Sequence, residues 1–202
     1  MNDVKQPLTH RQRQALATQQ VIVDAARVLF LEQGYGTTTI DAIAMKAGVA
    51  VSTVYAIFKN KRGILKAIRE EWHQQSGQRA IYSQALAESD AYKRIELAAH
   101  ATRRQWETGG NMIAIYKSAA DVDTEAAVEM QESLSGRRRN MQHFISESLP
   151  LLRPDLSVEK ATALFLALTL AEIYQELVGQ LGWSADEYEA WLAQTLKQQL
   201  LP

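Results

Sequence analysis

The sequence predicts an all-α protein, and three observations lead to this fold class. Apolar residues recur at helical spacing along nearly all of the 202 residues. Clear β alternation is absent, and the one short β-branched run, at 37–40, suits the start of a helix better. Only four prolines occur, and none interrupts a long periodic segment. We therefore expect about nine helices.

The first predicted helices are short and have clear start and stop signals. Their expected ranges are 18–33, 38–47, 51–58 and 61–75. Gly34 and Gly48 end the first two, because glycine adopts the positive φ of a helix terminus without strain. Thr38 and Asn60 are the expected caps of the second and fourth.

Longer helices are predicted beyond residue 80. Their expected ranges are 91–108, 111–119, 124–148, 158–181 and 185–201. Ser184 with Glu187 three residues later forms a capping box, in which each side chain accepts from a free backbone N–H. The segment 158–181 is apolar on more than one face, so it must be covered on both sides.

The composition argues against an enzyme and against a metal or other cofactor. The chain has no cysteine, and its four histidines are scattered without the spacing of metal ligands. Nucleophile-elbow, phosphate-loop and dinucleotide-binding patterns are absent. No signal-peptide pattern opens the chain, and the uncharged run 161–171 is shorter than the roughly 18 residues of a membrane span. We expect a soluble, cytoplasmic protein without a membrane partner.

The charges are unevenly distributed along the chain. Residues 1–69 hold ten Lys/Arg against four Asp/Glu, a net charge of +6, so the remainder carries -7 of the total of -1. A basic first third on an acidic body predicts contact with a polyanion through that third. Chance clustering of solvated charges is the alternative.

Two short apolar helices joined by Ala47-Gly48-Val49 have the form of a helix-turn-helix. The surrounding string, GYGTTTIDAIAMKAGVAVSTVYAIFKNKRGIL at 34–65, resembles the DNA-binding domain of the tetracycline-repressor (TetR) family. In detail the resemblance covers about residues 18–72. It implies a flexible arm at 1–17, a DNA-binding domain of three helices at 18–60, and a larger helical domain for ligand binding and dimerisation at 61–202.

The recognition helix of such a motif presents its first residues to base edges in the major groove. Val51, Ser52 and Thr53 are the expected base-reading residues, through a thymine methyl or hydrogen bonds. Ala56-Ile57 replaces polar residues common in the family, so readout at Ile57 would depend on apolar contacts and DNA shape.

Other residues are expected to contact the DNA backbone. Thr39 and Lys61, each at a helix N-terminus, and the hydroxyl of Tyr55 are candidates for phosphate contacts. Arg11 and Arg13 would add contacts from the arm. The alternatives are that Thr39 is only a cap, Tyr55 a packed side chain and Lys61 a solvated one. Val54 and Phe58 are expected in the core.

The resemblance further implies a small-molecule pocket and a homodimer. The candidate pocket residues are Trp106, Met112, Tyr116, Met141, His143, Phe144 and Phe165. The candidate dimer-interface residues are Phe165, Leu168, Tyr188, Trp191 and Leu192. Packing within one chain is the alternative for both sets. Arg137, Arg138 and Arg139 fan out around their helix, and we expect them to face solvent.

The sequence therefore predicts a homodimeric, DNA-binding transcription regulator, a repressor that a small molecule releases from a near-palindromic operator. One alternative is a DNA-binding or architectural protein without a ligand. Another is a helical small-molecule-binding protein or enzyme that retains a vestigial motif, which would show no salt-dependent affinity for duplex DNA.

Overall fold

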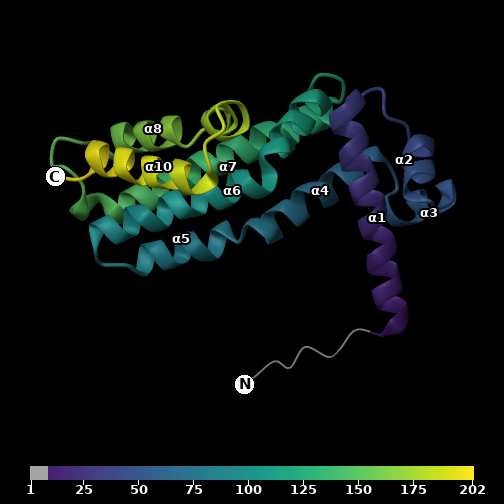
Figure 1. The fold of residues 1–202 in the computed structure, drawn as a ribbon, viewed down its shortest axis with the longest axis horizontal. Coiled ribbons are helices and arrows are strands. Elements are labelled where there is room, and N and C mark those ends of the chain that lie inside the picture. The colour runs from purple at the N-terminus through teal and green to yellow at the C-terminus, as the bar shows by residue number, and fades with distance from the viewer. Residues whose placement is uncertain (1–8) are drawn as a thin grey trace.

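The computed structural model describes residues 9–202, and within this range it confirms the all-α prediction. The helices are α1 (His10–Gln33), α2 (Ile40–Ala47), α3 (Val51–Phe58), α4 (Lys61–Ser76), α5 (Gln78–Ala87), α6 (Ala91–Ala120), α7 (Thr124–Ser148), α8 (Val158–Leu168), α9 (Ala171–Tyr174) and α10 (Ala185–Leu200), with short 3₁₀ and π segments at η1 (Leu149–Leu151) and η2 (Gln175–Gln180). Helices α1–α3 form one end of an elongated molecule, α5–α10 form the body, and α4 runs between them (Figure 1).

Helix α1 begins at His10 rather than at residue 18, because Thr9 caps it. The Thr9 side chain accepts from the backbone N of Gln12, and the Gln12 side chain accepts from the backbone N of Thr9. Residues 10–17 are therefore helical rather than part of an arm. Residues 1–8 of the expected arm lie outside the described part of the chain.

The predicted helix-turn-helix is present, with one change at its start. Thr39, not Thr38, caps α2 and accepts from the backbone N of Ala42 at 3.1 Å. Thr38 is buried instead, and its hydroxyl donates to the Gly34 carbonyl at 2.7 Å. Gly48 has the left-handed φ of +68° at the end of α2, and the chain then enters α3 at 108° to α2.

Two differences from the predicted helices occur in the body. Helix α5 was not predicted. The predicted break between 91–108 and 111–119 is present as a kink in α6, where Gly109 has the non-helical φ of -140° and ψ of 16°. The predicted helix at 158–181 is broken after α8. There the hydroxyl of Thr169 donates to the Phe165 carbonyl at 2.7 Å, a back-bond that bends helices.

One hydrophobic core runs from the helix-turn-helix into the body, with α4 and α6 shared by both ends. The segment Val158–Gln180 behaves differently, because only 33% of its most apolar stretch is buried in this chain. By length and composition alone this segment would also suit a membrane span, a property that core helices share. Part of its apolar surface is therefore left uncovered within the described residues.

Candidate nucleic-acid interface

Helix α3 has one buried and one exposed face. Val54 and Phe58 are buried in the core, as predicted. Tyr55 is 51% exposed and Ile57 is 38% exposed, one on each flank of the buried face. The exposed face is therefore free for a partner outside the chain.

The expected base-reading residues lie in the first turn of α3. Ser52 is exposed, whereas Val51 and Thr53 are half-buried. Ala50 precedes the helix and makes no side-chain cap, so the first backbone N–H groups remain available at this end. The first turn thus presents one exposed hydroxyl, one half-buried hydroxyl and one apolar side chain.

The two candidates for phosphate contacts differ in their surroundings. Thr39 is exposed, and its hydroxyl proton stays available while the oxygen caps α2. The Lys61 ammonium instead donates to the backbone carbonyls of Tyr35, Gly36 and Thr38, the last at 2.9 Å. It also lies 4.3 Å from the centroid of the Tyr35 ring. Burial of this ammonium lowers the pKa of Lys61.

The loop that Lys61 holds is bound from its other side by the body of the protein. The backbone N of Tyr35 donates to the Ser118 hydroxyl at 3.0 Å, and the Tyr35 hydroxyl donates to Asp123 at 3.2 Å. Burial, with Asp123 nearby, raises the pKa of Tyr35. Arg62 pairs with Asp123 at 3.8 Å. We call Tyr35, Lys61, Arg62, Ser118 and Asp123 the loop clasp.

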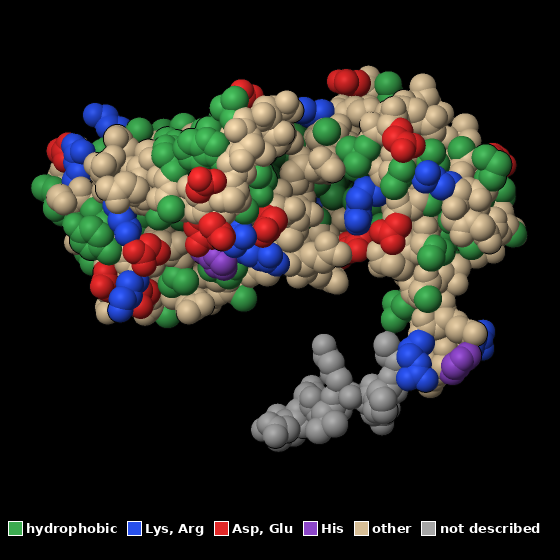
Figure 2. All heavy atoms as spheres, in the orientation of Figure 1, with side chains coloured by type: hydrophobic (Ala, Val, Ile, Leu, Met, Phe, Trp, Pro, Cys, Tyr) green, Lys and Arg blue, Asp and Glu red, His purple; other side chains and the backbone are tan. Residues whose placement is uncertain are grey.

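The sequence analysis did not identify the loop clasp. Tyr35 and Asp123 are separated by 88 residues, so local spacing carries no sign of their contact. The exposure of Met45, 81% on the outer face of α2, was also not anticipated. Arg11 and Arg13 are exposed in the first turn of α1, and Figure 2 shows this basic end projecting from the rest of the molecule.

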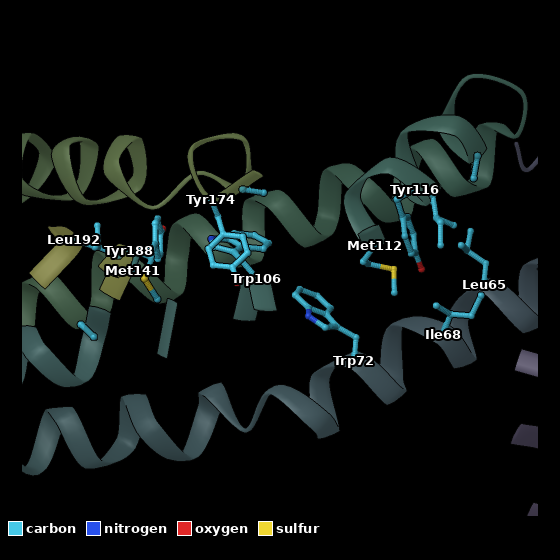
Figure 3. Close-up of a cluster of buried hydrophobic side chains, with 14 of the residues drawn as sticks. Leu65, Ile68, Trp72, Trp106, Met112, Tyr116, Met141, Tyr174, Tyr188 and Leu192 are labelled. Carbon is cyan, nitrogen blue, oxygen red and sulfur yellow. The ribbon is translucent and has the colours of Figure 1, made fainter. Parts of the chain in front are cut away.

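A cavity of about 580 Å³ lies between α4, the kink of α6 and η2, with Arg27 of α1 at its edge. Of the predicted pocket residues, Trp106 and Met112 line it. Trp72 and Tyr174 are lining residues that the sequence analysis missed, and Figure 3 shows Trp72 projecting from α4 toward Trp106 and Met112 of α6.

The other predicted pocket residues lie outside this cavity. Tyr116, Met141, Phe144 and Phe165 are buried core residues. His143 is exposed on the outer face of α7, so its prediction as a lining residue was wrong. An aromatic or methionine residue on a helix does not by itself reveal whether it faces a cavity or packed neighbours.

One of the three consecutive arginines turns inward, contrary to the prediction. Arg138 and Arg139 are exposed, but Arg137 is half-buried and donates to both the carbonyl and the hydroxyl of Thr169 at 2.7 Å. Thr169 ends α8, where the helix dipole favours a cation. Arg137 therefore fixes the break after α8.

Three of the predicted dimer-interface residues are covered within a single chain. Phe165, Tyr188 and Leu192 have no exposed surface, so they cannot meet a second copy directly. Leu168 and Trp191 are half-buried and keep some surface. Apolar periodicity alone could not separate the face that packs on α6 from the face that points outward.

Small residues are exposed on the outward faces of α8 and α10, among polar neighbours. On α8 the exposed residues Ala163 and Ala167 share one face, since they are four residues apart, and the exposed Leu170 follows the end of the helix. On α10 the exposed residues Ala190 and Gln194 are four residues apart. We call these five residues the outer patch.

Known proteins share the N-terminal part of the sequence. Residues 22–68 match the family model described as "Bacterial regulatory proteins, tetR family". The chain is 37% identical to the transposon Tn10 TetC protein of Escherichia coli over 83 residues, 41% of this chain and 36% of that protein. It is 38% identical over 76 residues to YvkB, an uncharacterized HTH-type transcriptional regulator of Bacillus subtilis strain 168, covering 38% of each chain. The matched segments thus span little more than a third of these relatives.

A solved structure shares the fold over nearly the whole chain. The SmeT–triclosan complex superimposes with a TM-score of 0.73 at 21% sequence identity, covering 92% of each chain. At this level of identity the similarity concerns the fold, including the body beyond the helix-turn-helix.

Proposed function

We propose that the chain is a regulator of the tetR family, because residues 22–68 match the model of that family and related regulators share this segment. It would be a DNA-binding transcriptional repressor that acts as a homodimer and releases its operator when a small molecule binds in the body. Its place of action would be the cytoplasm, where the DNA is.

The exposed first turn and outer face of α3 carry the proposal of DNA binding. Because Val54 and Phe58 anchor one face in the core, Ser52, Tyr55 and Ile57 are held toward the outside. The 108° angle between α2 and α3 is the arrangement that places a recognition helix in a major groove. Thr39 and the start of α1 supply contacts beside the groove.

The outer patch supports the proposal of a dimer. Single DNA-binding helices contact few base pairs, and dimers place two of them in successive grooves roughly 34–36 Å apart. Alanines at the patch let two helix pairs approach closely, and the largely uncovered segment Val158–Gln180 would gain its cover there. The operator would accordingly be near-palindromic.

The cavity between α4 and α6 supports the proposal of release by a ligand. Its volume of about 580 Å³ suits a small molecule. The SmeT structure, which shares this fold, was solved with triclosan. A ligand that binds one arrangement of α4 more tightly than another would shift the population of DNA-competent dimers.

Selection of bound duplexes from a random DNA pool tests this function directly. We expect enrichment of a near-palindromic site, with affinity that falls steeply as salt rises. Thr53→Ala should change the preference at one position in each half-site, because a lost base contact costs about 1–3 kcal/mol there. An unchanged preference would remove Thr53 from the reading residues, and a failure to enrich any duplex at low salt would refute the proposal.

A further inference from the structure

The cavity contains two indole rings whose hydrogen-bonding groups are already used. Trp72 and Trp106 lie nearly parallel, with 6.3 Å between centroids and 18° between planes. The indole N–H of Trp72 donates to the Gln105 carbonyl at 2.9 Å, and that of Trp106 donates to the Thr169 carbonyl at 3.2 Å. Trp72 is 9% and Trp106 4% exposed, so these side chains offer an occupant only the parts of the rings that border the cavity.

The shape of α6 keeps these rings at the cavity. A Cβ atom at Gly109 would overlap the Trp72 indole, so only glycine at the kink lets Trp72 lie against the α6 backbone. Across the cavity, Gln175 of η2 donates to the Gly110 carbonyl at 2.8 Å and holds the third wall in place. Met112 adds a polarizable thioether beside the rings.

The charged residues at the cavity already have partners within the chain. Arg27 pairs with Glu71 at 2.6 Å. Glu107 pairs with Arg103 at 3.2 Å and with Arg104 at 3.1 Å. An ionised ligand would have to break one of these pairs or be buried without a counter-charge, and both are unfavourable.

We propose that the cavity binds an uncharged, flat aromatic compound that packs against the parts of Trp106 and Trp72 that line it. This inference rests on the proposed function, in which the same cavity holds the effector. The amides of Gln75, Asn111 and Gln180 at the cavity give hydrogen bonds to a hydroxyl or carbonyl group at the edge of such a ring. Because Trp72 belongs to α4 and Arg27 to α1, the occupant contacts the elements that carry the DNA-binding end.

The test compares three probes of similar size by calorimetry: 2-naphthol, which is neutral and aromatic, 2-naphthoate, which is anionic, and decahydro-2-naphthol, which is neutral and saturated. We expect 2-naphthol to bind at least about tenfold more tightly than the other two. Equal or tighter binding of 2-naphthoate would overturn the uncharged class. Equal binding of the saturated probe, or no saturable binding of any probe, would overturn the aromatic class.

The site is tested with the emission of the protein itself. In a variant with Trp183→Phe and Trp191→Phe, the remaining tryptophans are Trp72 and Trp106. Their fluorescence emission should change as 2-naphthol is added and should saturate at the same probe concentration as in the calorimetric titration. Trp106→Leu should weaken the binding of 2-naphthol about tenfold. Tyr116→Phe is the matched control, since Tyr116 is buried outside the cavity, and should bind as before.

Two further measurements separate the possible failures. Circular dichroism checks that the Trp106→Leu variant is folded. If it is not, Gly110→Leu replaces it and fills the cavity from another wall. This substitution can be accommodated because a Cβ atom at Gly110 meets no atom within 4 Å. Both folded variants binding 2-naphthol as tightly as the parent would place the probe elsewhere and overturn the inference. Operator binding is measured without any probe, so intact DNA binding with no selective probe binding would refute only the ligand class.

Discussion

Lys61 holds the loop before α2 through its side-chain ammonium. Its three ammonium protons match the three carbonyls of Tyr35, Gly36 and Thr38. A phosphate would have to compete with these acceptors. The position of Lys61 at a helix N-terminus predicted a phosphate contact. The sequence could not predict its carbonyl partners, because they lie in a loop more than twenty residues earlier in the chain.

We therefore expect Lys61→Met to act through stability. Loss of these charge-assisted bonds should lower the free energy of unfolding by about 1.5–3 kcal/mol. Operator affinity should fall alike for all sequences, while the slope of log affinity against log salt stays unchanged. Thermal unfolding and titrations at several salt concentrations measure both. A slope reduced by ~1 with undiminished stability would identify Lys61 as a phosphate contact instead.

Helix α6 shows which features of an element the sequence could predict. Its two ends were predicted to within a residue, as were those of α7 and α10, and the capping box of α10 was also predicted, because start and stop signals are local. The pair Gly109-Gly110 indicated a break between two helical segments, and the backbone of α6 does leave helical geometry there, at Gly109. The break after α8 was not predicted. At this break Thr169 is bound by Arg137, a residue from another helix whose contact local spacing does not reveal.

The two adjacent glycines of α6 give a matched test of the kink. Gly109→Ala should lower the free energy of unfolding by about 1–3 kcal/mol and change Trp72 emission, because the added methyl group overlaps the indole. Gly110→Ala should be neutral or stabilising by up to about 1 kcal/mol, since its Cβ meets no atom within 4 Å. Chemical denaturation followed by tryptophan emission distinguishes them. Equal losses in both variants would mean that the helix, not the Trp72 contact, requires glycine.

At the scale of the whole molecule, the two-part architecture followed from the sequence, but the cavity and the outer patch did not. The cavity requires α1, α4, α6 and η2 to meet, and no single periodic segment contains that information. The candidate interface residues Tyr188 and Leu192 are apolar and lie on the inner face of α10. The alanines of the outer patch could not be predicted as interface residues from the sequence, since alanine occurs both in protein interiors and on protein surfaces.

A charge placed in the outer patch should separate the proposed dimer. We expect Ala167→Glu to shift the protein to a monomer in sedimentation experiments and to weaken operator binding at least about tenfold, since an unpaired carboxylate would be buried at the contact. Gln131→Glu, at an exposed position of α7, adds the same charge away from the patch and should remain a dimer. A dimeric Ala167→Glu variant would place the contact elsewhere.

The separation of the outer patch from α3 has a genetic consequence. Copies that differ only in the reading helix would keep identical contact faces and would pair without discrimination. In a cell that expresses both an intact and a damaged allele, many intact subunits would then be in mixed dimers. These mixed dimers would bind one half-site of the operator poorly. Substitutions at Ser52 or Thr53 should accordingly be dominant over the normal allele, whereas substitutions at Ala167 should be recessive.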